Sequence, residues 1–273
     1  IFCQIFDIID PNINWDKLSF KNGSPPHDWF YGKILHLKKS LSESLKEKGK
    51  TNEDFKEWKD KLFQKRSLRN APSKDEKIIN SWNSLMCEAI VKAYQITGNH
   101  KYLEAAKKNN SFIWGHLQTN GRMKTSWKDG KTKNDGNLED YAFYAKSCIE
   151  LYKVTSDRLY LERSTIITQS VLNFFKDPLS DTFFFTPRDG EKLIFRSKNS
   201  NDNSVPSGNS VFAGVLVRLG HLLKKNYYLT KAKSIFNELS YIAKESPHLY
   251  SSLIREYILF ESGPNEIILT TGI

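Results

Sequence analysis

The chain has 273 residues, of which 39% are hydrophobic and 13% aromatic, enough for the core of one large domain or two small ones. Charged residues make up 26% of the chain, and the mean hydropathy is −0.54. No stretch approaches the ~20 apolar residues that a membrane-spanning helix needs. The composition excludes disorder of the whole chain, and we expect a soluble protein with no membrane partner.

The formal net charge of +10 is unevenly distributed. Residues 1–137 hold 25 basic and 16 acidic side chains, whereas residues 138–273 hold 16 and 15. In the first half, lysines are spaced among acidic residues, a pattern that is typical of a solvated helix face. We therefore expect no nucleic-acid partner, and binding of an anionic polymer to residues 33–69 is left as a weaker alternative.

Cysteine and histidine patterns bear on redox and metal chemistry. Cys3, Cys87 and Cys148 form no C-x-x-C pair, which predicts reduced, mostly buried thiols. The histidines show no metal-ligand spacing, and no Walker, Rossmann or nucleophile-elbow motif occurs, so we expect neither a metal nor a cofactor. The first residues lack a signal-peptide pattern, which favours a cytoplasmic protein, and Ile1 in place of Met predicts that the true N-terminus lies upstream.

Turn-forming residues dominate the start of the chain. Residues 1–39 lack a sustained period and contain pairs such as Asp10-Pro11, so we expect a loop-rich lead-in. Residues 40–273 are predicted to hold helical-hairpin repeats. The first helix in this part begins at the N-cap Thr51 and carries a narrow apolar stripe.

Three pairs of adjacent helices follow, and the apolar spacing places them within residues 85–120, 141–175 and 211–239. The second helix of each pair opens with a similar signature around Tyr102, Tyr160 and Tyr228. A helical hairpin cannot bury its apolar face alone, so the repeats must stack into a solenoid or close into a ring. Units this long, with long loops on one side, favour an all-α fold of the α/α toroid type.

Two long segments connect these pairs. Residues 119–138 read as a polar, Gly-rich loop. Residues 177–208 contain two Phe-rich runs on either side of Asp189-Gly190, which predicts a short β-hairpin insertion near 183–198.

Polar clusters stand where the first helix of each pair begins, at Ser81–Ser84, Asn137–Asp140 and Pro206–Ser210. If these helices run parallel around a ring, their N-termini meet at one end, where free N–H groups suit a hydroxyl-rich or anionic ligand. The sequence therefore predicts a pocket with aromatic walls at that end. The alternative is that each cluster only caps its own helix.

Acid–base chemistry needs a carboxylate or histidine in such a pocket. Our candidate catalytic residues are Glu139, Asp140 and Asp189, with Trp82 or Trp127 as the platform on which a sugar stacks. Glu139 and Asp140 are adjacent, so only one can face the ring while the other caps or pairs elsewhere. The residues that we expect to bind substrate are Trp82, Asn83, Trp127, Tyr141, Arg196, Lys198, Asp202, Ser207 and Asn209.

Several of these segments together resemble the YyaL-like proteins, also called spermatogenesis-associated thioredoxin-domain proteins. The matching segments are Pro72–Lys77, Ser81–Met86, Glu139–Ala142, Phe183–Thr186 with Asp189 and Glu191, Arg196–Lys198, Asp202 and Pro206–Ser210. Their order and spacing agree over about residues 30–270. The family pattern has Gly where this sequence has Ser84, a small departure that leaves the motif recognisable.

The resemblance implies a thioredoxin-like domain followed by an (α/α)6 toroid similar to N-acylglucosamine 2-epimerases and six-hairpin glycosidases. This chain would be the C-terminal part of that toroid, about half a ring, with the thioredoxin-like domain and the first hairpins upstream. The catalytic histidines of the related epimerases have no matching position here, so epimerase activity is not carried over.

The leading hypothesis is a carbohydrate-active or carbohydrate-binding toroid with a sugar-like small-molecule ligand. Fold analogy supplies only a prior for this function. The rival hypothesis is a non-catalytic scaffold or protein-interaction domain that supports a thioredoxin-like redox domain.

Overall fold

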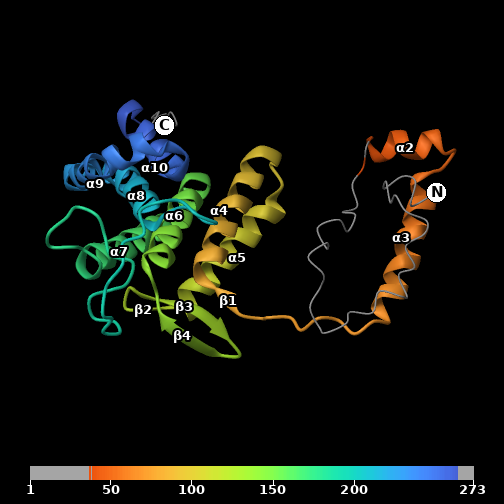
Figure 1. Cartoon of the computed structure of the whole chain (residues 1–273), viewed down its shortest axis with the longest axis horizontal. Coiled ribbons are helices and arrows are strands. Elements are labelled where there is room, and N and C mark those ends of the chain that lie inside the picture. Colours follow the sequence, from red (N-terminus) through yellow and green to blue (C-terminus); the bar gives the residue numbers. More distant parts are fainter. Residues whose placement is uncertain (1–36, 38, 264–273) are drawn as a thin grey trace, which may run out of the picture. The chain divides into compact units, whose positions relative to one another are not determined.

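The computed structural model describes residue 37 and residues 39–263, so nearly all of the predicted lead-in and Cys3 lie outside the described residues (Figure 1). The chain divides into two compact units, Ile1–Asp75 and Glu76–Ile273. The sequence places the start of the repeats at residue 40. The contacts instead group the helices of residues 40–75 with the first unit.

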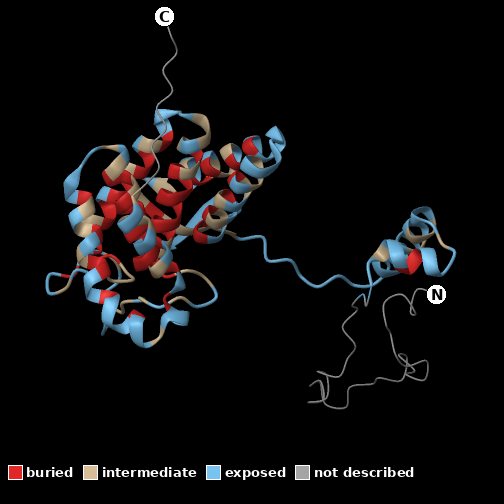
Figure 2. Cartoon of the chain, turned by 90° about the horizontal axis from the view of Figure 1, so that it is seen from above, coloured by how far each residue is buried: buried red, intermediate tan, exposed pale blue. Residues whose placement is uncertain are grey.

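The described part of the first unit holds two helices, α2 (Leu41–Glu47) and α3 (Asn52–Ser67). Both begin with a capping box, and the predicted N-cap Thr51 accepts a hydrogen bond from the backbone N–H of Asp54. α3 buries none of its residues, and Figure 2 shows both helices as mostly exposed. These helices therefore contribute little to the hydrophobic core.

The second unit contains the three predicted helical hairpins and a further helix that the sequence reading missed. In order, the helices are α4 (Asn80–Thr97), α5 (His100–His116), α6 (Leu138–Thr155), α7 (Arg158–Phe174), α8 (Gly208–Leu222), α9 (Asn226–Glu245), the 3-10 helix η3 (Pro247–Leu249) and α10 (Ser251–Ser262). The first helix of each hairpin packs against the next one, from α4 through α6 and α8 to α10. We call these four the inner helices, and α5, α7 and α9 the outer helices.

Short turns join α4 to α5, α6 to α7 and α8 to α9. α4 ends at Gly98 and α6 at Ser156, both with positive φ, and the next residue in each case, Asn99 or Asp157, caps the outer helix with its side chain. The left-handed residue ends one helix, and the cap starts the next in a new direction. This local chemistry explains why the hairpins could be predicted from the sequence.

The inner helices begin at the same end of the unit. The carboxylate of Asp140 in α6 accepts a hydrogen bond from the N–H of Ser81 in α4, at 3.0 Å. Asp202 likewise accepts from the N–H groups of Ser207 and Ser252, at 2.9 and 2.7 Å, and so joins the starts of α8 and α10. The predicted gathering of helix N-termini is confirmed, and α10 joins it.

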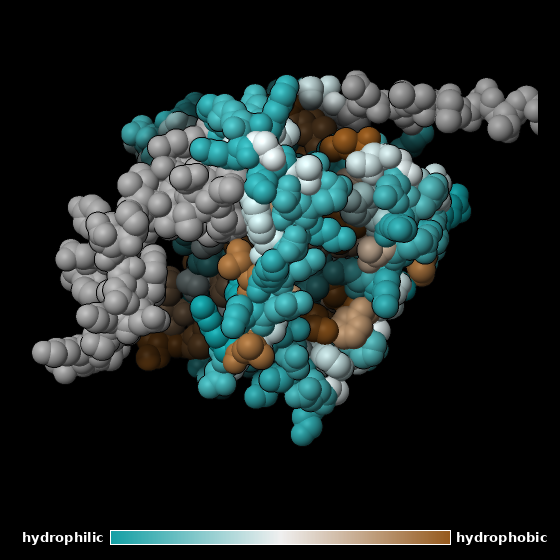
Figure 3. Space-filling view, turned by 90° about the vertical axis from the view of Figure 1, so that its right-hand side faces the viewer, coloured by the Kyte–Doolittle hydropathy of each residue, from teal (hydrophilic) through white to brown (hydrophobic). Residues whose placement is uncertain are grey.

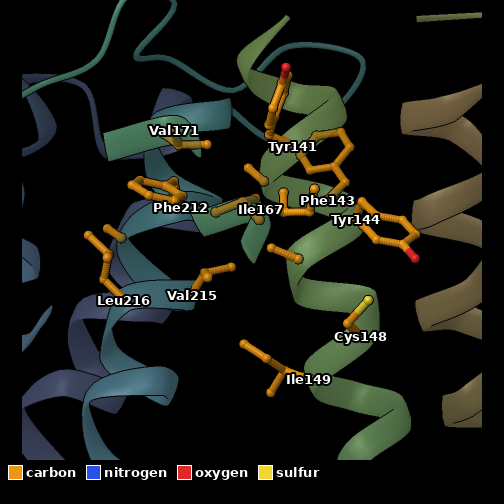
Figure 4. Packing of buried hydrophobic residues seen from close by; sticks show 14 of the residues in the cluster. Tyr141, Phe143, Tyr144, Cys148, Ile149, Ile167, Val171, Phe212, Val215 and Leu216 are labelled. Atoms are coloured by element: carbon orange, nitrogen blue, oxygen red, sulfur yellow. The ribbon is translucent and has the colours of Figure 1, made fainter. Parts of the chain in front are cut away.

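The core lies between α6 and its neighbours. Figure 4 shows Phe212 and Val215 of α8 on the side of α6 toward which Ile149 points, whereas Tyr144 and Cys148 point the other way. Figure 2 shows the buried residues gathered inside this unit.

Cys87 and Cys148 are buried free thiols, as predicted, and burial raises their pKa values to about 12 and about 11.

A small antiparallel sheet lies at the end where the inner helices begin. Its strands are β1 (Ile78–Ile79), β2 (Gln118–Thr119), β3 (Arg122–Lys128) and β4 (Lys131–Asp135), and β3 pairs with each of the others. The sequence reading of 119–138 as a loop was therefore wrong. The two residues between β3 and β4, Asp129 and Gly130, both have positive φ, as a tight hairpin turn requires.

The β-hairpin predicted near 183–198 is wrong, because no paired strands form there. Only an isolated bridge joins Lys176 to Phe183. The side chain of Asn209 occupies both the N–H and the C=O of Phe183, at 2.8 and 3.0 Å, so these groups are not available to a strand partner. The segment is an irregular loop held by side chains and by scattered backbone hydrogen bonds, such as that from the N–H of Phe185 to the C=O of Ser197, rather than by a continuous ladder.

Hydrophilic and hydrophobic residues share the surface of the described residues, which include exposed apolar side chains such as Leu179 and Ile194. Hydrophilic residues cover most of the face in Figure 3, with smaller hydrophobic patches between them. Within residues 37 and 39–263, no helix is both long enough and apolar enough to cross a bilayer.

Gly214 of α8 provides the first testable prediction. A Cβ atom there would overlap the carboxyl group of Glu256 on α10, which is fully buried and held by three cations, so it cannot move without leaving charges unpaired. We expect Gly214→Ala to lower the free energy of unfolding by about 1–3 kcal/mol, as measured by urea unfolding. In the matched control Gly115→Ala, the new Cβ meets open space, and helix propensity should raise stability by up to ~1 kcal/mol. Equal effects of the two changes would contradict the close contact.

Candidate functional site

Asp140 is the structural member of the adjacent carboxylate pair. It is fully buried and accepts hydrogen bonds from the N–H groups of Ser81 and Asn137 and from the Thr125 hydroxyl, each at 3.0 Å. Burial raises its pKa to about 7, against the effect of these three donors. Asp140 thus joins α4, β3 and the start of α6, and its oxygens are already in use.

Glu139, in contrast, makes no side-chain hydrogen bond or ion pair with any residue that the structure describes. Partial burial raises the pKa of this carboxyl. Its Cγ lies beside the start of α8, where a Cβ on Gly208 would come within 3.3 Å of it. Of the two adjacent carboxylates, one caps and the other remains available for chemistry.

The position of Glu139 on α6 shows where its side chain faces. Lys146, Glu150 and Lys153 follow it by 7, 11 and 14 residues, a spacing that places all four on one face of a helix. These three residues line a groove, so Glu139 lies at the N-terminal end of the same face.

This groove, which we call the inner groove, has a volume of about 540 Å³. It is lined by Leu85, Glu88, Ala89 and Lys92 of α4, Lys146, Glu150 and Lys153 of α6, Pro206, Val211 and Arg218 at or in α8, and Arg255 of α10. The volume falls in the range of small-molecule sites. A hollow of similar size, about 570 Å³, lies along the end of α3, and among the described residues its lining comes from one helix and its C-cap, from Lys61 to Leu68.

Ion pairs connect the four inner helices within the groove. The Nζ of Lys146 lies 2.9 Å from Glu88 of α4 and 3.6 Å from Glu256 of α10. Arg218 of α8 bonds Glu256 and lies 3.9 Å from Glu150. Charged side chains from all four inner helices therefore meet in this groove.

Glu256 is the most deeply buried charge of this network. Burial works to raise its pKa, but Arg218 and Lys146 hold the pKa below its usual value, so the group is ionised at neutral pH. Sequence reasoning missed the network. The available signal was the set of charged residues at helical spacing within otherwise apolar segments, such as Arg218 in the run Val215–Leu219.

The predicted aromatic platforms lie in different places. Trp82, in the first turn of α4, is 64% exposed and precedes the groove-lining Leu85 by three residues, so it lies near the groove mouth on the same side of the helix. Trp127 instead packs edge-on against Phe112 and His116 and holds the sheet to α5. Of the two, Trp82 is the one beside the groove.

Three charged residues of the predicted site, Asp189, Arg196 and Lys198, lie in the 177–208 loop. Asp189 forms an ion pair of 2.8 Å with Arg122, whose guanidinium stacks on Phe174 at the end of the outer helix α7. Arg196 donates to a backbone carbonyl within the same loop, and Lys198 pairs with Asp177 there. These contacts hold the loop, and none of the three residues lines the inner groove.

The remaining predicted binding residues form structural hydrogen bonds. Tyr141 accepts from the N–H of Met123 and holds β3, and Asn83 bonds the outer helix through Asn109. Ser207 caps α8, Asp202 joins α8 to α10, and Asn209 holds Phe183. Helical spacing thus places Glu139 and Trp82 on the helix faces that lead toward the groove, without lining it, and the other predicted residues serve mainly as caps and loop anchors.

Comparison with known proteins places this geometry in context. No family model matches the sequence. The chain is 28% identical over 256 residues to an uncharacterised protein of Caenorhabditis elegans, covering 87% of this chain and 34% of that protein. It is 27% identical over 207 residues to spermatogenesis-associated protein 20 of Homo sapiens, covering 72% of this chain and 26% of that protein. The chain therefore spans about a third or less of these relatives.

Two solved structures share the architecture. A GH76 α-mannanase of Bacteroides thetaiotaomicron matches with a TM-score of 0.54 at 18% identity, covering 72% of this chain and 56% of that one. A cellobiose 2-epimerase of Spirochaeta thermophila matches with a TM-score of 0.51 at 13% identity, covering 62% and 44%. The second unit therefore has the α/α toroid fold of these glycosidases and epimerases, and the similar sequences support the family resemblance.

The titration of Asp140 provides the second prediction. An unfolded Asp titrates near pH 3.9, whereas the folded chain keeps this proton up to about pH 7. Between these values the folded state binds more protons, so the contribution of Asp140 to the free energy of unfolding falls as pH rises from 4 to 7. Urea unfolding across this range should show the fall in the original protein but not in Asp140→Asn. The control Asp129→Asn, in an exposed turn, should keep the fall in the free energy of unfolding. The same fall in Asp140→Asn as in the original protein would contradict the raised pKa of Asp140.

Proposed function

We propose that the second unit is a carbohydrate-binding or carbohydrate-active toroid whose ligand enters at the N-terminal end of the inner groove. The observation that carries this proposal is Glu139, a partly buried carboxyl that has no partner among the described residues and lies on the helix face that leads into a groove of about 540 Å³. The mannanase and epimerase that share the fold act on carbohydrates by name, which supports the choice of ligand.

Glu139 is suited to general acid–base work. A carboxyl whose pKa is raised by burial keeps its proton closer to neutral pH, and it can then give that proton to a leaving oxygen or take one from a sugar carbon. Asp140, as the cap, keeps the backbone of Glu139 in place. For the second carboxylate, Glu88 and Glu150 line the groove, whereas Asp189 is held by Arg122 at the outer helix.

Trp82 completes the proposed site. Its exposed indole at the groove mouth offers an apolar face against which the C–H face of a sugar ring can stack. From the family resemblance we also propose that a thioredoxin-like domain lies upstream in the full-length chain. On the same ground we propose that this chain is the C-terminal part of the toroid and that the protein is cytoplasmic.

Thermal denaturation with a panel of neutral sugars tests this proposal. We expect a sugar such as mannose, cellobiose or a mannobiose to raise the melting temperature, and Trp82→Ala to abolish the shift. Glu139→Gln should keep the shift and lower any turnover by about 10²–10⁴-fold, because it removes the transferable proton. The control Asp189→Asn should change neither. The absence of a shift with every sugar would contradict the proposal.

A scaffold function is the second candidate, and the many capping roles at the helix N-termini favour it. Asp140, Asp202, Ser207 and Asn209 are all engaged in holding helices and loops. On this view Glu139→Gln leaves cellular function intact, whereas changes that disrupt the toroid surface do not. Loss of function in Glu139→Gln with a normal melting temperature would exclude the scaffold alone.

A further inference from the structure

The inner groove carries more positive than negative charge. Its cations outnumber the carboxylates that line it or lie beneath it by five to three. The cations are Lys92, Lys146, Lys153, Arg218 and Arg255, and the carboxylates are Glu88, Glu150 and Glu256. A surplus of this kind in a concave site raises the local concentration of anions.

The carboxylates are already shared among several cations. Glu256 alone contacts three, with Lys146 at 3.6 Å, Arg255 at 2.9 Å and Arg218 closest of all. Glu150 is 2.8 Å from Lys153 and is also approached by Arg218. Glu88 is 2.9 Å from Lys146, so each of the three carboxylates that line the groove or lie beneath it already has a cation partner.

Two cations keep free capacity at the groove surface. Lys92 has no carboxylate partner among the residues that the structure describes, and it is exposed. Arg255 is 56% exposed and uses one nitrogen for Glu256, which leaves its other donors open to the groove. Lys153, also half-exposed, stands beside them. These side chains can turn toward a ligand at little cost in desolvation.

The buried part of the network holds the surface cations in place. The Lys146 side chain is only 5% exposed and that of Glu256 is fully buried, and well-packed apolar side chains often replace such buried ion pairs without loss of stability. Stability alone therefore does not account for charges at this depth. They fix the four inner helices at a polar groove floor instead of an apolar one.

We propose that the inner groove binds a small hydroxylated molecule that carries a carboxylate or phosphate group, with Lys92, Lys153 and Arg255 contacting the anion. Both anions are ligands that Arg and Lys recognise through charge-assisted hydrogen bonds. Glu139 lies seven residues before Lys146, about 10 Å along the helix axis, and contacts the neutral end. The inference rests on the proposed carbohydrate function and narrows its ligand to acidic sugars.

Calorimetric titration of the 273-residue chain with three matched ligands tests the inference: glucose, glucuronate and glucose 6-phosphate. Inorganic phosphate serves as a fourth probe, for the anion alone. We expect at least one acidic sugar to bind ten-fold or more tightly than glucose. The relative affinities of glucuronate and glucose 6-phosphate distinguish a carboxylate from a phosphate site.

The variant Lys92→Gln/Lys153→Gln should lower the affinity for the acidic sugar about ten-fold and leave the affinity for glucose unchanged. Lys92 is exposed and the side chain of Lys153 is 47% exposed, so the fold should persist, and circular dichroism checks this. The control Lys131→Gln removes an exposed charge on β4, away from the groove, and should have no effect. An equal loss in Lys131→Gln would indicate non-specific attraction and overturn the inference.

The remaining outcomes separate the two proposals. If glucose binds as tightly as both acidic sugars, and only Trp82→Ala lowers the affinity, the preference for acidic sugars is overturned. The carbohydrate function would still stand. A different outcome is that inorganic phosphate binds as tightly as glucose 6-phosphate, with affinities that substitution of Trp82 or Glu139 does not change. That result would support an anion site in the groove and contradict the carbohydrate function. Binding of none of the four would overturn both.

Discussion

The buried carboxylate of Asp140 is the interaction on which the rest of the second unit depends. A helix start leaves N–H groups without partners, and burying such an end costs free energy unless an acceptor is supplied. Asp140 supplies that acceptor to two backbone segments at once, at Ser81 and at Asn137, while Thr125 ties it to the sheet. Asp202 performs the same task between α8 and α10. Shared acceptors of this kind fix the inner helices with their starts at one end.

Charge inside the curve of the inner helices is the second constraint. The core on the outer side is apolar and closely packed, whereas the inner side is bridged by Lys146, Arg218 and Glu256. The buried carboxylate of Glu256 is stabilised by the cations around it, and Gly214 provides the space for it to approach α8. The inner helices thus have one face that serves stability and one that keeps polar groups in a concave space. A toroid needs this division if its centre is to bind a ligand.

The extent of successful sequence prediction follows the range of the interactions. The hairpins were predictable because periodicity, a left-handed residue such as Gly98 and the next cap all lie close in sequence. The strand pairing of β3 and β4 also has a local signal in Asp129-Gly130, which the loop reading overlooked. The hairpin expected at 183–198 failed for a non-local reason, since Asn209 from the next helix takes the backbone groups of Phe183. The ion-pair network joins residues up to 168 positions apart, from Glu88 to Glu256, so spacing along the chain could not reveal it.

The adjacent pair Glu139 and Asp140 shows how capping and chemistry are separated at one helix start. Successive residues on a helix point about 100° apart, so the partner network that occupies Asp140 cannot also reach Glu139. Residues with the right chemistry for a site are also those that caps need, and most of the polar residues predicted to bind substrate are used as caps or anchors. The informative residue is therefore the one left without a structural task. At the start of α6 that residue is Glu139, and its helix face leads directly into the charged groove.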